Sequence, residues 1–252
     1  MEYTIEYKGK TNLDFNLYWD TRDFELGTGL PNIDQNSVAG INGTLLDFNR
    51  AYKSFEQKFT FYAVFKDMDA SECKRQLTNW LLKEPGYAPL RFSQDPNYIF
   101  NAAPNPNSII KFPAYNKRFA KVEITFLFKP FKYSVLGREN PYTLTAGTSY
   151  QFYNPEQWRA YPFIYIQNGS GDITVKINDN EYKLLAVDGD IYIDCTPEKS
   201  IVYHDLTVQG SRNRKAIFPD HKFPYFEPNL NHVTINGSFD KATITPNWRC
   251  LC

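Results

Sequence analysis

Few residues in this chain could support metal or cofactor chemistry. Three histidines occur, and none lies in a zinc-binding spacing or in an HExxH motif. The chain also lacks a GxSxG elbow, a P-loop and a GxGxxG turn. We therefore expect no catalytic residues, no metal and no cofactor, unless the fold gathers distant ligands. The histidines are His204, His221 and His232.

A group of carboxylates in the second half allows two interpretations. Asp188 and Asp190 flank Gly189, and Asp179 lies in the preceding turn. Carboxylates at this spacing could bind calcium, but Asp and Asn also favour tight turns for backbone reasons. We prefer the turn interpretation. A glycosidase would need two facing carboxylates, which the sequence neither excludes nor indicates.

The four cysteines are interpreted as free thiols. They are Cys73, Cys195, Cys250 and Cys252, and no pair has the CxxC spacing. The first residues lack the features of a signal peptide, so we expect folding in a reducing cytoplasm. Cys250 and Cys252 alternate beside Trp248 and could form a soft-metal pair, although two ordinary strand residues are the simpler interpretation.

Charge and hydropathy exclude two classes of partner. Lys and Arg number 28, as do Asp and Glu, so the formal net charge is zero. Residues 1–133 carry 17 basic and 15 acidic groups and residues 134–252 carry 11 and 13, so neither half has the basic excess of a nucleic-acid-binding protein. No apolar run is long enough to span a bilayer. We expect no sequence-specific DNA binding and no membrane insertion.

One amphipathic helix is predicted after residue 69. Asp69 is a plausible N-cap, and Glu72 lies at the spacing of a capping box. Leu77, Trp80 and Leu81 continue an apolar stripe that begins at Cys73, which places them on one core-facing side. Pro85 and Gly86 end the helix. This is the only helix that the pattern predicts with a defined start and stop.

The remaining pattern predicts strands and turns. Aromatic residues make up 17% of the chain and favour strands. Residues 53–65 alternate as a strand that we expect at a sheet edge, whereas residues 27–43 suggest a long exposed loop. From residue 161, four short strands separated by the turns NGSG, NDNE and DGD predict a sandwich or barrel.

The segment FLFKPFKY, residues 126–133, suggests a domain boundary. Its alternation is interrupted at Pro130, which cannot donate a ladder hydrogen bond, so the strand should end there or lie at an edge. Turn-rich sequence follows Tyr133. We therefore predict two β-rich domains, residues 1–133 and 134–252, with Pro130 and Tyr133 at the junction.

The order of these motifs resembles the distal tail protein (Dit) family of phages with long non-contractile tails. The resemblance is carried in the first half by NGTLLDFNRAYKSFEQKFTFYA, DASECKRQLTNWLL, APLRFSQDPNYIF and VEITFLFKPFKY. In the second half it is carried by YPFIYIQNGSGDITVKIN, IYIDC and FPYFEPNLNHVTINGSFDKATITPNWR. One departure is Asn229, where a glycine is expected; Asn also tolerates the left-handed conformation.

This resemblance implies both a fold and a function. It implies a mainly β chain, with an N-terminal β-sandwich that carries one α-helix and forms a ring, followed by a galectin-like C-terminal β-sandwich. It also implies a homohexameric ring in the virion, joining the tail tube protein to tail-tip proteins, with a receptor-binding protein as a further partner and DNA passing through the hole. The alternative is a carbohydrate-binding protein, for which Trp158 and Tyr165 are candidate aromatic residues; an enzyme ranks third.

Overall fold

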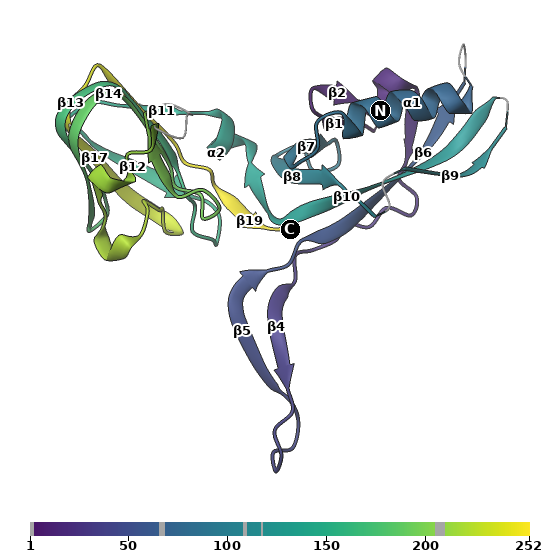
Figure 1. Ribbon diagram of the computed structural model, residues 1–252, viewed down its shortest axis with the longest axis horizontal. Coiled ribbons are helices and arrows are strands. Elements are labelled where there is room, and N and C mark those ends of the chain that lie inside the picture. Colours follow the sequence, from purple (N-terminus) through teal and green to yellow (C-terminus); the bar gives the residue numbers. More distant parts are fainter. Residues whose placement is uncertain (1–2, 66–68, 108–109, 117, 205–209) are drawn as a thin grey trace. The chain divides into compact units, whose positions relative to one another are not determined.

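The computed structural model describes residues 3–65, 69–107, 110–116, 118–204 and 210–252. It forms two compact units, one made of residues up to Lys132 together with Leu251 and Cys252, and the other of Tyr133–Cys250. Both are mainly antiparallel β-structure, as predicted (Figure 1). The last two residues lie with the first unit, whereas the sequence-based division had assigned them to the second domain.

The first unit is a curled nine-stranded antiparallel sheet with the order β2-β1-β7-β8-β10-β6-β3, and β9 and β19 also pair with β10. β6 lies between β10 and β3, so the prediction that residues 53–65 form an edge strand was wrong. The reason is the apolar–polar alternation in β3, which buries Leu17 and Trp19 and packs the Trp19 ring against Phe59 of β6. The elements are β1 (Ile5–Tyr7), β2 (Lys10–Thr11), η1 (Asn12–Phe15), β3 (Leu17–Asp20), β6 (Phe55–Val64), β7 (Ala88–Phe92), β8 (Tyr98–Pro104), β9 (Ile110–Tyr115), β10 (Phe119–Ser134) and β19 (Arg249–Leu251).

Helix α1 (Ala70–Leu82) begins and ends close to the predicted limits. The Asp69 side chain accepts a hydrogen bond from the Glu72 backbone N–H at 2.8 Å, which caps the helix. In a full capping box the Glu72 carboxylate would also accept from the Asp69 backbone N–H. Here it accepts hydrogen bonds from the Arg75 and Gln76 side chains along the helix instead. Within the described residues, no helix is long and apolar enough to cross a membrane.

A two-stranded hairpin replaces much of the loop predicted at residues 27–43. β4 (Pro31–Asn36) pairs with β5 (Leu45–Tyr52) and forms a sheet of its own, separate from the nine-stranded sheet (Figure 1). Gly43, at φ +93°, lies in its connecting segment, where a left-handed residue is needed. We call residues 31–52 the arm. The loop prediction failed because Pro and Asn within the first strand, PNIDQN, and the glycines on either side of it are typical of a loop.

The second unit is an eight-stranded sheet folded on an aliphatic core. Its central path is β11-β18-β13-β14-β15, with β17 joining β12 to β13 and β16 pairing with β14. A short helix, α2 (Val135–Glu139), precedes it and was not predicted. The strands are β11 (Tyr142–Leu144), β12 (Ser149–Asn154), β13 (Phe163–Ile177), β14 (Asn180–Asp194), β15 (Ile201–Tyr203), β16 (Ala216–Ile217), β17 (Asn229–Ser238) and β18 (Lys241–Thr245); the 3-10 turns are η3 (Asn213–Lys215) and η4 (Pro219–His221).

The four short strands predicted from residue 161 are in fact two long ones. β13 and β14 each span 15 residues and pair along most of their length, and only the segment around Asn178 is a hairpin turn. The predicted turns NGSG and DGD instead face each other within this strand pair, between two register shifts, one at Gln167–Asn168 of β13 and one at Leu185–Ala186 of β14. Asn168, Ala186 and Gly189 have positive φ. Asn229 also has a positive φ, +67°, as the resemblance required of that position.

β10 continues through Pro130 to Ser134, so the strand does not end at the proline. Its carbonyl group is still used, because the Cys252 backbone N–H donates to Pro130 O at 2.9 Å. Pro130 lacks only the backbone N–H, so it cannot donate a hydrogen bond to a neighbouring strand at this position. The two compact units divide just after it, between Lys132 and Tyr133.

We expect each unit to fold alone. Each has its own buried cluster of apolar side chains, aromatic in the first and largely aliphatic in the second. Fragments 1–132 and 133–250 should each be soluble and melt cooperatively in circular dichroism. The control is the second unit cut inside β13, as fragments 133–170 and 171–250, which should both aggregate because each exposes part of one core. Two insoluble fragments from the cut at Lys132 would contradict the two-domain division.

Candidate assembly surface

Two of the residues considered for metal chemistry, Asp190 and His204, take part in hydrogen bonds. Asp190 accepts hydrogen bonds from the Asn168 backbone N–H at 2.9 Å and from the Tyr165 hydroxyl at 3.0 Å. The His204 ring nitrogen Nδ1 lies 2.6 Å from the Asp190 carbonyl oxygen. In the described part of the chain, no three His, Cys, Asp or Glu side chains are close enough to hold a metal ion.

Two of the four cysteines lie in the cores. Cys73 belongs to the apolar side of α1, and burial raises the pKa of its thiol to about 11. Burial also raises the pKa of Cys195 well above its ordinary value. Both thiols are therefore protonated and unreactive at neutral pH. Cys250 and Cys252 are half-buried and free of disulfides.

The predicted helix residues contact the sheet of the first unit. Leu77 and Leu81 are fully buried, and the Trp80 ring stacks on Phe15 with centroids 4.6 Å apart. The Trp80 indole N–H donates to the Tyr7 carbonyl oxygen at 2.8 Å, which links α1 to β1. These side chains support the fold and offer no exposed binding surface.

The aromatic residues proposed for sugar binding have little open ring surface. The Tyr165 ring stacks on the Tyr192 ring with centroids 4.7 Å apart, and Tyr192 stacks on Tyr203 at 5.2 Å. The rings of these three neighbouring strands therefore cover one another's faces. Burial and the hydrogen bond to Asp190 raise the pKa of Tyr165 to about 12. Trp158 is only partly exposed. A flat aromatic face of the kind that sugars stack on is therefore not formed by Tyr165.

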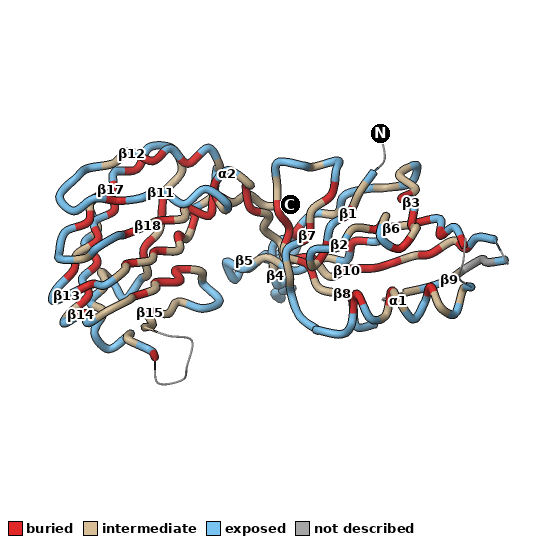
Figure 2. The backbone as a smooth tube through the Cα atoms, turned by 90° about the horizontal axis from the view of Figure 1, so that it is seen from above, coloured by how far each residue is buried: buried red, intermediate tan, exposed pale blue. Residues whose placement is uncertain are grey.

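The arm is the most exposed apolar feature of the first unit. None of its residues is buried, whereas β10 of the same unit is buried (red) over much of its length in Figure 2. Leu46 is 64% exposed, and the flanking Leu30 is 61% exposed. The other exposed apolar side chains of the arm are Val38, Ile41, Leu45 and Phe48. A concentration of exposed apolar side chains on an isolated hairpin is typical of a surface that another protein covers.

The arm also brings two like charges together. Asp34 on β4 lies directly opposite Asp47 on β5 in the strand register. Like charges at facing positions destabilise an antiparallel pair. Arg50, at φ +60°, is exposed further along β5. A basic group from a bound partner between the two carboxylates would relieve this repulsion.

The base of the arm packs against β10. A side chain at Gly29 would meet Pro130 Cβ at 2.6 Å, so only glycine allows this approach. The Lys53 backbone N–H donates to the Leu30 carbonyl oxygen at 2.8 Å and closes the base. The Tyr52 and Phe131 rings meet edge to face, with centroids 5.6 Å apart. Pro130 thus marks where the arm leaves the sheet.

Comparisons with solved structures show which fold the whole chain adopts. The structure matches the SPP1 Dit protein (gp 19.1), described as a paradigm of the hub adsorption apparatus in Gram-positive infecting phages, with a TM-score of 0.68 and 16% identity over 100% of both chains. The chain has the fold of a phage Dit protein. It also matches a chain of the phage P2 baseplate in its activated conformation, with a TM-score of 0.52 and 9% identity over 100% of this chain and 98% of that chain.

The Dit fold therefore extends over the whole chain, both units included. Neither a protein-family model nor a curated protein matches the sequence. The fold predicted from the motif order is confirmed, although identities of 16% and 9% are too low for residue-by-residue transfer of function. The arm was missed from the sequence. The motif NGTLLDFNRAY, which spans Asn42–Tyr52, contained its second strand and could have revealed it.

Proposed function

We propose that this protein is the structural hub at the tail tip of a long-tailed phage with a non-contractile tail. One observation carries the proposal: a Dit fold along the full length of the chain, shared with a protein described as a hub of an adsorption apparatus. The chain would form a homohexameric ring that connects the tail tube to the host-adsorption apparatus. Its assembly would take place in the host cytoplasm.

In this proposal the first unit forms the ring and the second is a galectin-like domain that meets other tail-tip proteins. The exposed apolar arm supports the assignment of the ring to the first unit, because its free strand edges and Leu, Ile and Phe side chains need cover. The partners would be the tail tube protein, a tail-tip protein and a receptor-binding protein. DNA would pass through the ring without base-specific contacts, consistent with a net charge of zero.

The role that we propose is structural and not enzymatic. Asp190, one of the carboxylates considered for chemistry, is engaged by the Tyr165 hydroxyl and the Asn168 backbone N–H. We expect the purified chain to release no fragments from peptidoglycan or polysaccharide in a reducing-sugar assay. Reproducible turnover that a single Asp or Glu substitution abolishes would contradict this expectation.

Arm variants provide a specific test of ring formation. Leu46→Ser with Phe48→Ser removes two exposed apolar side chains from one face of the arm. The fold of both units should remain unchanged. We expect these changes to shift the particles from hexamers to smaller species in light scattering coupled to size exclusion. The control is Tyr153→Ser on β12, outside the arm, whose side chain is at 63% about as exposed as Leu46. If the double variant still forms hexamers, the arm is not part of the interface.

The proposed location is tested on virions. Antibodies raised against the purified chain should label one end of the phage tail, at the junction of tube and tip, in negative-stain images. Labelling confined to the capsid or to the length of the tube would contradict the proposal. A Tyr165→Ala variant that still assembles and adsorbs normally would also argue against the alternative, sugar binding through that ring.

A further inference from the structure

Three Asn-Gly pairs in this chain have nearly the same neighbours in the sequence but different surroundings in the fold. They are Asn42-Gly43, Asn168-Gly169 and Asn236-Gly237. Each pair is followed by Thr or Ser, and both Asn42 and Asn236 are preceded by Ile. Differences in the chemistry of these pairs must therefore come mainly from the structure.

An Asn-Gly pair can modify itself without an enzyme, because asparagine is a thermolabile residue. The backbone nitrogen of the glycine attacks the Asn side-chain carbonyl carbon, a C–N bond forms, and the amide nitrogen leaves as ammonia with a proton from the attacking N–H. Water then opens the resulting cyclic imide at either carbonyl group, which gives Asp or isoaspartate. The reaction needs an unhindered glycine nitrogen and a backbone that is free to leave the extended conformation.

The first pair meets these requirements at the tip of the arm. Asn42 and Gly43 lie in the segment between β4 and β5, beyond the last paired residues Asn36 and Leu45, and both are exposed. Among the described residues, no hydrogen bond holds the Asn42 side chain or the Gly43 N–H. A side chain at Gly43 would meet no atom within 4 Å outside its chain neighbours, so open space surrounds the attacking nitrogen.

The second pair is held at both its side chain and its backbone. The Asn168 side-chain N–H donates to the Asp240 carboxylate at 2.7 Å, and the Asn168 backbone N–H donates to the Asp190 carboxylate at 2.9 Å. Gly169 is buried within the pairing of β13 with β14. The leaving amide and the attacking nitrogen are therefore both fixed.

The third pair is exposed, but its backbone is fixed. Asn236 lies in β17 opposite Thr174 of β13. Gly237, at φ +137°, is so close to β13 that a side chain there would meet the Asp172 carbonyl oxygen at 3.0 Å. Exposure alone does not make this pair reactive, because the strand must open before the glycine nitrogen reaches the side chain.

We propose that Asn42 is a site of spontaneous deamidation in the folded protein, and that the fold protects the other two pairs. The reaction adds one carboxylate to the arm. The arm already carries the carboxylates of Asp34 and Asp47 against the single guanidinium of Arg50, so its net negative charge doubles. The proposal concerns a chain whose arm is uncovered, and it does not depend on ring formation.

Peptide mapping by mass spectrometry compares the three sites in one sample. Trypsin places them on three separate peptides, because Lys and Arg residues lie between each pair and the next. At mildly alkaline pH the folded chain should lose the amide of Asn42 at least about tenfold faster than those of Asn168 and Asn236, because paired strands open in only a small fraction of molecules. In urea, where no pair is protected, the three rates should become similar. Similar rates in the folded chain, or an equally large difference in urea, would overturn the proposal.

Two variants complete the test. Gly43→Ala hinders the attacking nitrogen and should slow the loss at Asn42 several-fold while the other two sites react as before; an unchanged rate would overturn the proposal. Leu46→Ser with Phe48→Ser repeats the measurement on an arm that assembly is not expected to cover. Fast loss at Asn42 in this double variant alone supports the site and shows that assembly covers the tip, whereas slow loss in both chains would overturn the proposal. If the natural chain forms no ring, the comparison of the three sites is unaffected.

Discussion

Trp80→Ala should destabilise the first unit by about 3–5 kcal/mol, the range for removing a large aromatic side chain from a core. The ring is 8% exposed and stacks on Phe15. Its removal leaves a cavity between α1 and the sheet. It also leaves the Tyr7 carbonyl oxygen without the indole N–H that donates to it at 2.8 Å. Hydrogen exchange read by mass spectrometry should show faster exchange across the first unit and unchanged exchange in the second.

Two control variants separate the contributions to this effect. Trp80→Phe keeps an aromatic ring against Phe15 but lacks the N–H donor, so we expect a smaller loss of about 1–2 kcal/mol. Arg75→Ala lies on the exposed side of the same helix, where its ion pair with Glu72 is open to solvent, and should change stability by at most about 0.5 kcal/mol. Unchanged exchange in Trp80→Ala would mean that the apolar side of α1 does not support the core.

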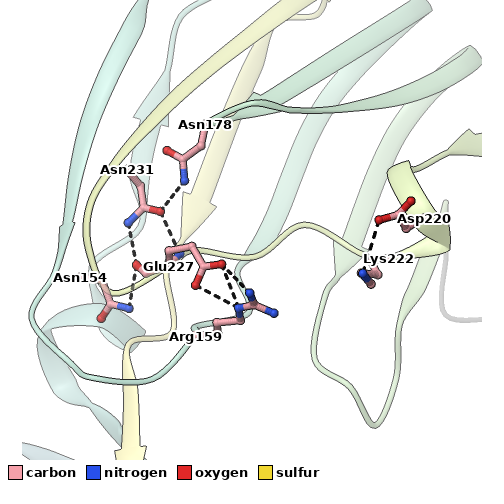
Figure 3. Close-up of polar contacts among 7 residues, drawn as sticks. All are labelled: Asn154, Arg159, Asn178, Asp220, Lys222, Glu227 and Asn231. Atoms are coloured by element: carbon pink, nitrogen blue, oxygen red, sulfur yellow. Dashed lines mark hydrogen bonds and ion pairs between the residues drawn. The ribbon is translucent and has the colours of Figure 1, made fainter.

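Asn231→Ala should destabilise the second unit by about 3–4 kcal/mol, the range for breaking a buried network that leaves several polar groups unpaired. Asn231 is fully buried and its side chain makes four hydrogen bonds, of which those to Asn178 and Glu227 are drawn in Figure 3. Its amide nitrogen donates to the carbonyl oxygens of Glu227 and Asn229 at 2.8 and 3.0 Å. Its oxygen accepts from the Glu227 backbone N–H and from the Asn178 side chain, both at 2.9 Å. Alanine would leave buried polar groups without partners, which is expensive in a low-dielectric interior.

The network around Asn231 supplies its own controls. Asn231→Asp keeps the shape but replaces a donor with a second acceptor facing two carbonyl oxygens, so it should destabilise as strongly as alanine. Lys222→Gln breaks the exposed 3.5 Å pair with Asp220, also drawn in Figure 3, and should change stability by at most about 0.5 kcal/mol. Urea unfolding of the natural protein and the variants gives the free energies. Similar midpoints for Asn231→Asp and the natural protein would show that the donors are unimportant.

The sequence was informative where one local rule decides the structure. The Asp69 cap and the apolar stripe of α1 are local features, and the helix forms between Ala70 and Leu82. Sequence reasoning failed where long-range pairing decides. An Asn-Gly pair can end a strand or bulge within it, and at Asn168 the pairing of β13 with β14 continues past it.

The candidate surfaces were less predictable than the fold. The base of the arm depends on Gly29, whose lack of a side chain allows Pro130 to approach it. Pro130 lies about one hundred residues later in the chain, and no local pattern encodes that contact. Asn231 is likewise one of several asparagines in its segment. Only the folded chain shows that its side chain, and not that of Asn229, is buried and makes four hydrogen bonds.

The ring is tested most directly by the mass of the purified chain in solution, measured by native mass spectrometry. Six times the 29.3 kDa chain predicts a particle of about 176 kDa. Negative-stain images of the same sample should then show closed rings with six-fold symmetry. A mass that stays at 29.3 kDa at high micromolar concentration, with no rings on the grid, would contradict the account of this protein as a ring-forming tail hub.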